Sequence, residues 1–121
     1  MKRVIQNPKP QRTLDRPPID DALIEEITRR IVEGVHPNRI ILFGSWARGD
    51  ARPDSDFDIF VEMESMDAPY YRHGKVRSVL RGVRAPMDLI VMTPDEVAAR
   101  RNSNVSIIPI IEREGRVLFQ R

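Results

Sequence analysis

The sequence contains no cysteine, which excludes a disulfide-stabilised fold, a thiolate zinc site and a cysteine nucleophile. It also lacks an apolar run approaching the roughly 20 residues that span a bilayer, and its basic N-terminus lacks the apolar core of a secretory signal. An excess of one charge sign is missing too, because 20 basic and 18 acidic residues leave a net charge of +2. We therefore expect a cytoplasmic protein that binds no membrane and does not bind nucleic acid directly.

The prolines are unevenly distributed along the chain. Four of the ten lie within residues 1–18, together with five basic residues and one acid. A segment of this composition buries little apolar surface, so residues 1–18 are predicted to form a flexible basic tail. The 121 residues are enough for one hydrophobic core. We therefore expect a single domain over residues 19–121.

Apolar side chains from Asp20 onward recur every three or four residues, which predicts a helix that stops at Gly34. Short apolar or alternating runs predict strands at 39–43, 56–63, 87–92 and 116–120. Further helices are predicted at 70–83, from Thr93-Pro94, and at 104–114, where Pro109 must lie in the first turns or kink the helix. Helices thus alternate with strands around a small mixed sheet, which predicts an α/β or α+β fold.

Gly44-Ser45 ends the first predicted strand abruptly. Glycine lets a backbone approach an anion closely, and a serine hydroxyl with the free amides of a following turn can donate to phosphate. Gly-Ser after a strand is also common turn chemistry, so this pair alone does not identify a site.

Asp56 and Asp58 lie two residues apart on a predicted strand and therefore share one face. Paired acids on an otherwise apolar strand are destabilising through like-charge repulsion and partial burial. A divalent cation removes this penalty, and magnesium favours carboxylate sites that it shares with substrate phosphates. The alternative interpretation is an exposed sheet edge on which both acids are simply solvated.

Asp88 is a third acid in an apolar strand. If its strand neighbours the one that carries Asp56 and Asp58, the three carboxylates share a face beside Gly44-Ser45. Such a group is typical of metal-assisted phosphoryl or nucleotidyl transfer, in which the protein positions the reactants and neutralises charge.

Gly44-Ser45, ten intervening residues and then Asp56-x-Asp58 resemble the signature of the DNA polymerase beta nucleotidyltransferase superfamily. The sequence also resembles the smallest branch of this superfamily, the minimal nucleotidyltransferases, in its short length and in the Ala-Arg-Gly at 47–49. The resemblance implies a small twisted mixed sheet flanked by helices, ATP as the nucleotide donor, and two Mg²⁺ ions held by Asp56, Asp58 and Asp88. It also implies that Gly44 and Ser45 bind the triphosphate. Arg48 could reach a phosphate oxygen, although a solvated arginine at this position needs no function.

The resemblance also carries an expectation about partners. Larger relatives append a helical domain that helps to hold the acceptor, and this chain stops soon after the core, so we expect another molecule to present the acceptor. Many minimal nucleotidyltransferases pair with a small helical HEPN-domain toxin and transfer AMP to one of its tyrosines. We therefore expect a protein adenylyltransferase that is the antitoxin of a type VII-like pair and forms a hetero-oligomer with its toxin.

Two other functions remain open from the sequence. One is nucleotidyl transfer to a small hydroxylated molecule or an RNA end, and the other is a non-catalytic antitoxin that neutralises its partner by binding alone. Trp46 could pack near a nucleotide, although a lone tryptophan beside a strand end is more typical of a core or an interface. Among the basic residues of the segment 70–84, Arg77, Arg81 and Arg84 share one helix face, which favours a solvated face, with docking of a partner or a phosphate-rich acceptor as the alternative.

Overall fold

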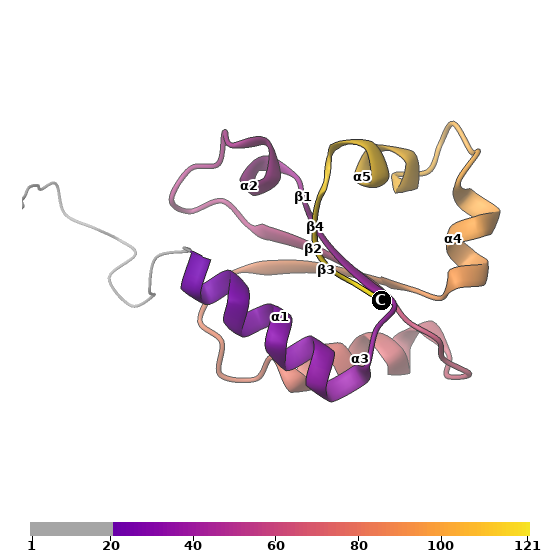
Figure 1. The fold of residues 1–121 in the computed structure, drawn as a ribbon, viewed down its shortest axis with the longest axis horizontal. Helices are drawn as coiled ribbons and strands as arrows, with labels where there is room; N and C mark the ends of the chain where they lie inside the picture. The colour runs from indigo at the N-terminus through magenta and orange to yellow at the C-terminus, as the bar shows by residue number, and fades with distance from the viewer. Residues whose placement is uncertain (1–20) are drawn as a thin grey trace, which may run out of the picture.

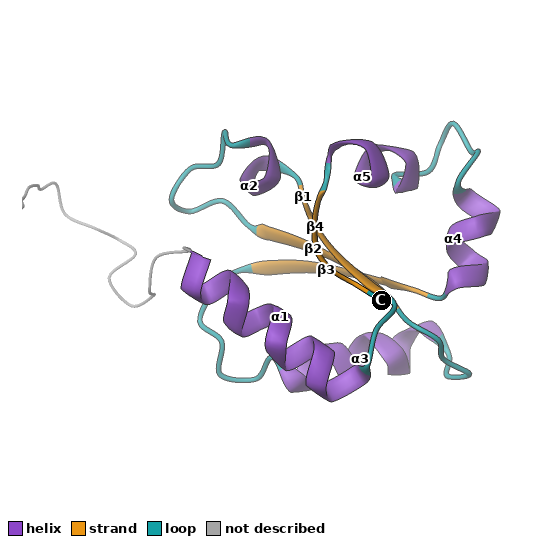
Figure 2. Cartoon of the chain, viewed as in Figure 1, coloured by secondary structure: helices purple, strands orange, loops and turns teal. Residues whose placement is uncertain are grey.

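Four strands form one sheet, and helices lie against both of its faces (Figure 1). This computed structural model describes residues 21–121, so the predicted tail at 1–18 lies outside the described residues. The elements, which Figure 2 distinguishes by type, are α1 (Asp21–Val35), β1 (Arg39–Phe43), α2 (Ser45–Arg48), β2 (Phe57–Glu62), α3 (Pro69–Val79), β3 (Met87–Met92), α4 (Pro94–Arg100), α5 (Ile108–Glu114) and β4 (Arg116–Gln120). Within residues 21–121, every helix is too short or too polar to cross a bilayer.

The strand order is β3-β2-β1-β4, in which β1 runs antiparallel to β2 and β4 while β2 runs parallel to β3. A parallel pair needs a crossover connection, and α3 supplies it here. The register places Asp58 opposite Asp88 on β3 and opposite Phe43 on β1. The predicted mixed sheet of an α+β domain is therefore confirmed, and the starts of β2 and β3 meet where β1 ends.

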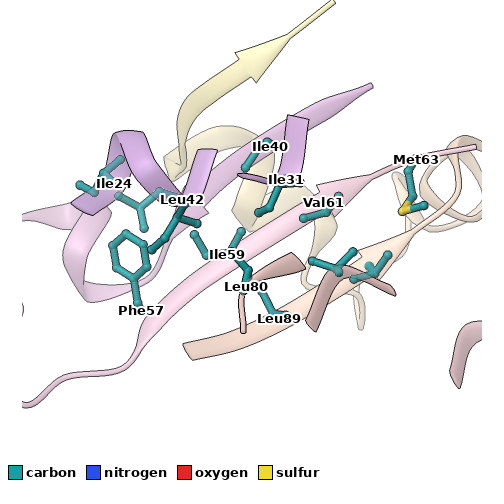
Figure 3. Packing of buried hydrophobic residues seen from close by; sticks show 13 residues of the cluster. Ile24, Ile31, Ile40, Leu42, Phe57, Ile59, Val61, Met63, Leu80 and Leu89 are labelled. Carbon is teal, nitrogen blue, oxygen red and sulfur yellow. The ribbon is translucent and has the colours of Figure 1, made fainter. Parts of the chain in front are cut away.

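The main hydrophobic core lies between the sheet and helices α1 and α3 (Figure 3). Ile27 and Ile31 of α1 are fully buried, so the apolar stripe read from the sequence is the stripe that packs. Phe57 and Ile59 of β2 are fully buried in the same core. Because side chains alternate along a strand, Asp58 between them faces the opposite side of the sheet.

Helices α4 and α5 cover part of that opposite face. The smaller core on this face consists of Ile41, Phe60, Val97, Ile108 and Ile111. Asp58 lies two residues before Phe60 on the same face and is half-buried, while Asp88 on β3 is exposed. The acids therefore occupy a part of the α5 face that solvent and ligands can reach.

The predicted stop of the first helix at Gly34 is wrong by one residue. Helix α1 continues to Val35, and the backbone turns out of it at His36, whose φ is 50°. Gly34 has a packing role instead, because a Cβ at this position would overlap the Cγ1 atom of Val79 on α3. The glycine lets the two helices on this face approach each other closely.

Two other helices are shorter than predicted. The helix expected at 70–83 ends at Val79, where the amide of Leu80 donates to the carbonyls of Arg77 and Ser78, and the chain then turns through Gly82 with a φ of 90°. The helix expected from residue 104 begins only at Ile108, whose amide donates to the Ser106 hydroxyl. Pro109 lies in its first turn, as the sequence predicts, because proline there sacrifices no helical hydrogen bond.

Arg77, Arg81 and Arg84 are exposed, as the sequence predicts, whereas Arg72 departs from the other basic residues of this segment. Its side chain is buried, and its Nη2 atom donates to both carboxylate oxygens of Glu96, at 2.6 and 2.7 Å. Because Glu96 belongs to α4, the ion pair joins helices from the two faces of the sheet. Arg72 thus stabilises the fold through an internal ion pair, and its side chain is not available to a partner.

Candidate functional site

Gly44 forms the bend between β1 and α2. Its φ of 75° and ψ of −156° are strained for any residue with a side chain. A Cβ at this position would also overlap the carboxylate of Asp58. Two independent constraints therefore require glycine, and the result is direct contact between the end of β1 and the Asp58 side chain.

Asp58 and Asp88 lie side by side on β2 and β3. They are register partners on parallel strands, which run about 4.8 Å apart. Burial raises the pKa of Asp58 above its usual value, and the charges of Asp88 and Asp56 raise it further, as does a hydrogen bond with Asp88. Arg48 opposes this rise in the pKa, so its guanidinium acts electrostatically on the pair. The arrangement concentrates negative charge that a cation can neutralise.

Asp56 lies immediately before β2, not within it as the sequence predicts, and it is exposed. Its charge still reaches Asp58. The segment that carries Asp56 is tied to α2, because the indole nitrogen of Trp46 donates to the carbonyl of Ser55 at 3.1 Å. The Trp46 ring also meets the Phe57 ring edge to face. This tie is what the sequence-based interpretation missed; its only signal is a lone tryptophan directly after Gly44-Ser45.

The other predicted site residues lie on α2. Ser45 begins this short helix and is half-buried. Arg48 ends it and is exposed, with its Nε atom 3.4 Å from Oδ2 of Asp50. The amides of Ala47 and Arg48 donate to the carbonyl of Gly44, which leaves the earlier amides of the turn without an intrahelical acceptor. These amides and the Ser45 hydroxyl lie one to two residues from the Gly44 bend that touches Asp58.

The residues at this end of the sheet fit a divalent cation in their chemistry. Asp58 and Asp88 offer carboxylate oxygens, the donors that magnesium prefers, and a cation would relieve their mutual repulsion. Within residues 21–121, however, no three acidic, histidine or cysteine side chains are already arranged as a metal cluster. The structure therefore brings Asp58 and Asp88 together, while closure of Asp56 onto the pair stays a prediction.

Comparison with protein-family models decides the family. A model described as the nucleotidyltransferase domain matches residues 22–118, a range that contains all the predicted site residues. The chain belongs to the nucleotidyltransferase domain family. The Gly44 bend and the acids Asp58 and Asp88 lie within this nucleotidyltransferase domain. Among curated proteins, none matches this nucleotidyltransferase domain significantly.

Solved structures share the fold of this nucleotidyltransferase domain. A candidate nucleotidyltransferase from Sulfolobus solfataricus is 22% identical, with a TM-score of 0.58 over 83% of this chain and 79% of that one. A toxin–antitoxin complex with AMP-PNP is 18% identical, with a TM-score of 0.58 over 81% of this chain and 73% of that one. A mutant of the MntA–HpeT toxin–antitoxin pair is 15% identical, with a TM-score of 0.55 over the same 81% and 73%. At these identities, the likeness establishes the fold.

Proposed function

We propose that the chain is a magnesium-dependent nucleotidyltransferase that transfers AMP from ATP to a protein hydroxyl, a tyrosine of a cognate HEPN-domain toxin. The observation that carries the proposal is the contact of the Gly44 bend with Asp58, beside its register partner Asp88, in a nucleotidyltransferase domain. The bend offers backbone to phosphate, and the acid pair offers ligands to a cation, so the two requirements of nucleotidyl transfer meet in one place.

Each residue has a defined task in this proposal. Asp56, Asp58 and Asp88 hold two Mg²⁺ ions, which neutralise phosphate charge when bound. The backbone of Gly44, the hydroxyl of Ser45 and the Arg48 guanidinium hold the triphosphate.

The transfer itself balances with the groups named. The acceptor oxygen forms a bond to the α-phosphorus of ATP, the bond from that phosphorus to the bridging oxygen breaks, and pyrophosphate leaves. The proton of the acceptor hydroxyl passes to Asp88, which lies exposed on β3 and is open to an incoming acceptor. The protein contributes position and charge rather than a covalent intermediate.

The proposed partner is supported by the two toxin–antitoxin structures. One of them contains AMP-PNP, an ATP analogue, and the other carries a mutant in which two aspartates two positions apart are replaced by glutamate. The spacing of those aspartates equals that of Asp56 and Asp58. Both observations are consistent with an adenine nucleotide donor and an acidic pair at the centre of this domain.

The test is transfer of label from ATP to the protein encoded beside this one. ATP labelled at the α-phosphate, with Mg²⁺, should label that partner, while ATP labelled at the γ-phosphate should not. Asp58→Asn should reduce labelling by at least about 10²-fold, the scale expected when a charge-stabilising group is removed. Glu64→Gln, an exposed acid beyond the far end of β2, is the matched control and should label normally.

The same assay separates the proposal from its rivals. Undiminished labelling by Asp58→Asn would overturn the assigned site. An unlabelled partner whose toxicity is still suppressed by Asp58→Asn would indicate a non-catalytic antitoxin. Turnover of ATP with a small hydroxylated acceptor or an RNA end, without the partner, would replace the protein acceptor.

A further inference from the structure

The side chain of Trp46 contacts both residues that flank Asp56. Its Nε1–H donates to the carbonyl oxygen of Ser55 at 3.1 Å. Its ring centroid lies 6.5 Å from that of Phe57, at an interplanar angle of 71°, which is a favourable edge-to-face arrangement. One side chain on α2 thus spans the backbone on either side of a proposed metal ligand.

Asp56 needs such support because regular sheet structure begins after it. The register of β2 with β3 starts at Phe57, and the register with β1 reaches only as far as Asp58. Phe57 is fully buried and its amide donates to the carbonyl of Pro86, so the C-terminal side of Asp56 is fixed by the core. The N-terminal side is a loop, and the Trp46 hydrogen bond fixes it at Ser55.

The loop itself is organised around Ser55. The Ser55 amide donates to the carbonyl of Arg52 at 2.9 Å, and the Arg52 amide donates to the Ser55 hydroxyl at 2.8 Å. This turn is closed on itself, and the Trp46 indole ties its Ser55 carbonyl to α2. Loss of the indole N–H would remove the tie between the Ser55 carbonyl and α2, directly before Asp56.

We infer that Trp46 is a positioning residue that holds Asp56 in line with Asp58 and Asp88 for a divalent cation. The inference rests on the proposed function, and it assigns Trp46 no contact with substrate. The ring also packs against the main core, so Trp46 has two separable tasks. The ring packs against the core, whereas the indole N–H positions the loop that carries Asp56.

The first test compares cation binding in variants of the full chain. Trp46→Phe keeps an aromatic ring against Phe57 but removes the donor to Ser55. We expect its affinity for Mn²⁺, measured by calorimetry in the presence of a non-hydrolysable ATP analogue, to fall about tenfold, as when groups that orient metal ligands are removed. Phe119→Leu, which trims the same core from β4, is the matched control and should bind Mn²⁺ as the wild type does. Replacement of Trp46 by 3-benzothienylalanine, an isosteric ring without the N–H, provides a second variant should Trp46→Phe fold poorly.

A double-mutant cycle separates positioning from general stability. If Trp46 acts through Asp56, adding Trp46→Phe to Asp56→Asn should not weaken Mn²⁺ binding further. A purely structural role would weaken binding by the same factor in both backgrounds and would overturn the inference. Equal Mn²⁺ affinity of wild type and Trp46→Phe would overturn it as well, while leaving the proposed function intact. A wild type that binds no Mn²⁺ would overturn both the inference about Trp46 and the proposed function.

Fluorescence supplies an independent readout, because Trp46 is the single tryptophan of the chain. Mn²⁺ with the nucleotide analogue should change its emission in the wild type, since a cation held by Asp56 would lie beside the loop that the Trp46 indole contacts. In Asp56→Asn this change should be lost. An emission change of wild-type size in Asp56→Asn would show that Trp46 is not coupled to Asp56 and would contradict the inference.

Discussion

Arg72 on α3 and Glu96 on α4 form an ion pair that links helices on opposite faces of the sheet. The Arg72 side chain is only 5% exposed, whereas that of Glu96 is 31% exposed. Glu96 also completes a capping box, accepting from the Thr93 amide while its own amide donates to the Thr93 hydroxyl. One carboxylate thus neutralises a buried cation and begins α4.

Glu96→Gln should lower the free energy of unfolding by about 2–3 kcal/mol, because it leaves the Arg72 charge buried without a counter-ion. The value lies below the range of about 3–5 kcal/mol for a fully buried pair, since Glu96 retains solvent contact. Glutamine still supports a capping box, so the loss reports the charge. Denaturant unfolding checks it, with Asp95→Asn in the same turn as the control, expected to change stability by at most about 1 kcal/mol.

Glu112 should make stability depend on pH. Hydrogen bonding to Arg101 lowers the pKa of Glu112, and burial partly offsets this effect. A hydrogen bond from Arg39 lowers the pKa further, so the pKa of Glu112 lies below the usual 4.5. A carboxyl with a lowered folded-state pKa stabilises the fold above its unfolded pKa, and this contribution is lost as pH falls through the folded pKa. Unfolding free energies should therefore fall from about pH 5 downward, and less steeply in Glu112→Gln. Equal acid slopes for the two proteins would contradict this assignment.

Gly44→Ala should abolish nucleotidyl transfer and lower stability by about 1–3 kcal/mol through strain at a positive φ and overlap with Asp58. Gly49→Ala is a close control, because Gly49 has a φ of 89° and its added Cβ would meet nothing within 4 Å. It also has a positive φ, in the left-handed region that costs a side chain less than the Gly44 conformation, and it lacks the overlap. We expect Gly49→Ala to retain transfer. Loss of transfer in both variants to the same degree would assign the effect to backbone strain instead of the contact with Asp58.

Asp58→Asn should stabilise the metal-free protein by up to about 1 kcal/mol while abolishing transfer, because it removes a partly buried charge beside two like charges. Residues selected for function often oppose stability in this way. Thermal unfolding with EDTA and with excess Mg²⁺ checks the expectation. Magnesium should raise the unfolding temperature of the wild type and leave that of Asp58→Asn unchanged. A variant that is less stable than the wild type in EDTA would contradict the proposed repulsion.

The sequence predicts the acid site well where local patterns decide it. Alternation along β2 already places Asp58 on the face opposite Phe57 and Ile59, and the structure confirms this. The glycine-serine bend is also local, since only a residue tolerant of positive φ can end β1 in this way. These features follow from the period of a strand and from glycine's backbone freedom.

Other features depend on contacts between distant segments, and the sequence cannot specify them. The parallel pairing that puts Asp88 beside Asp58 is a choice among several strand orders. The burial of Arg72 arises because α4 returns across the end of the sheet, and the fit of Gly34 against Val79 arises from the crossing of α1 and α3. An arginine in a helix can be exposed or buried, and a glycine near a helix end can stop the helix or allow close packing. The residue types alone therefore do not distinguish these roles.

The alignment of Asp58 with Asp88 has a consequence for how much change the domain can absorb. Side chains alternate between the two faces of a strand. A slip of β3 by a single residue would therefore put Met87 or Leu89 opposite Asp58 and turn the Asp88 carboxylate toward α3. Loop insertions at residues 64–68 leave that alignment intact, whereas one residue added or deleted inside β3 disturbs both the acid pair and the packing of Leu89 and Val91 in the main core.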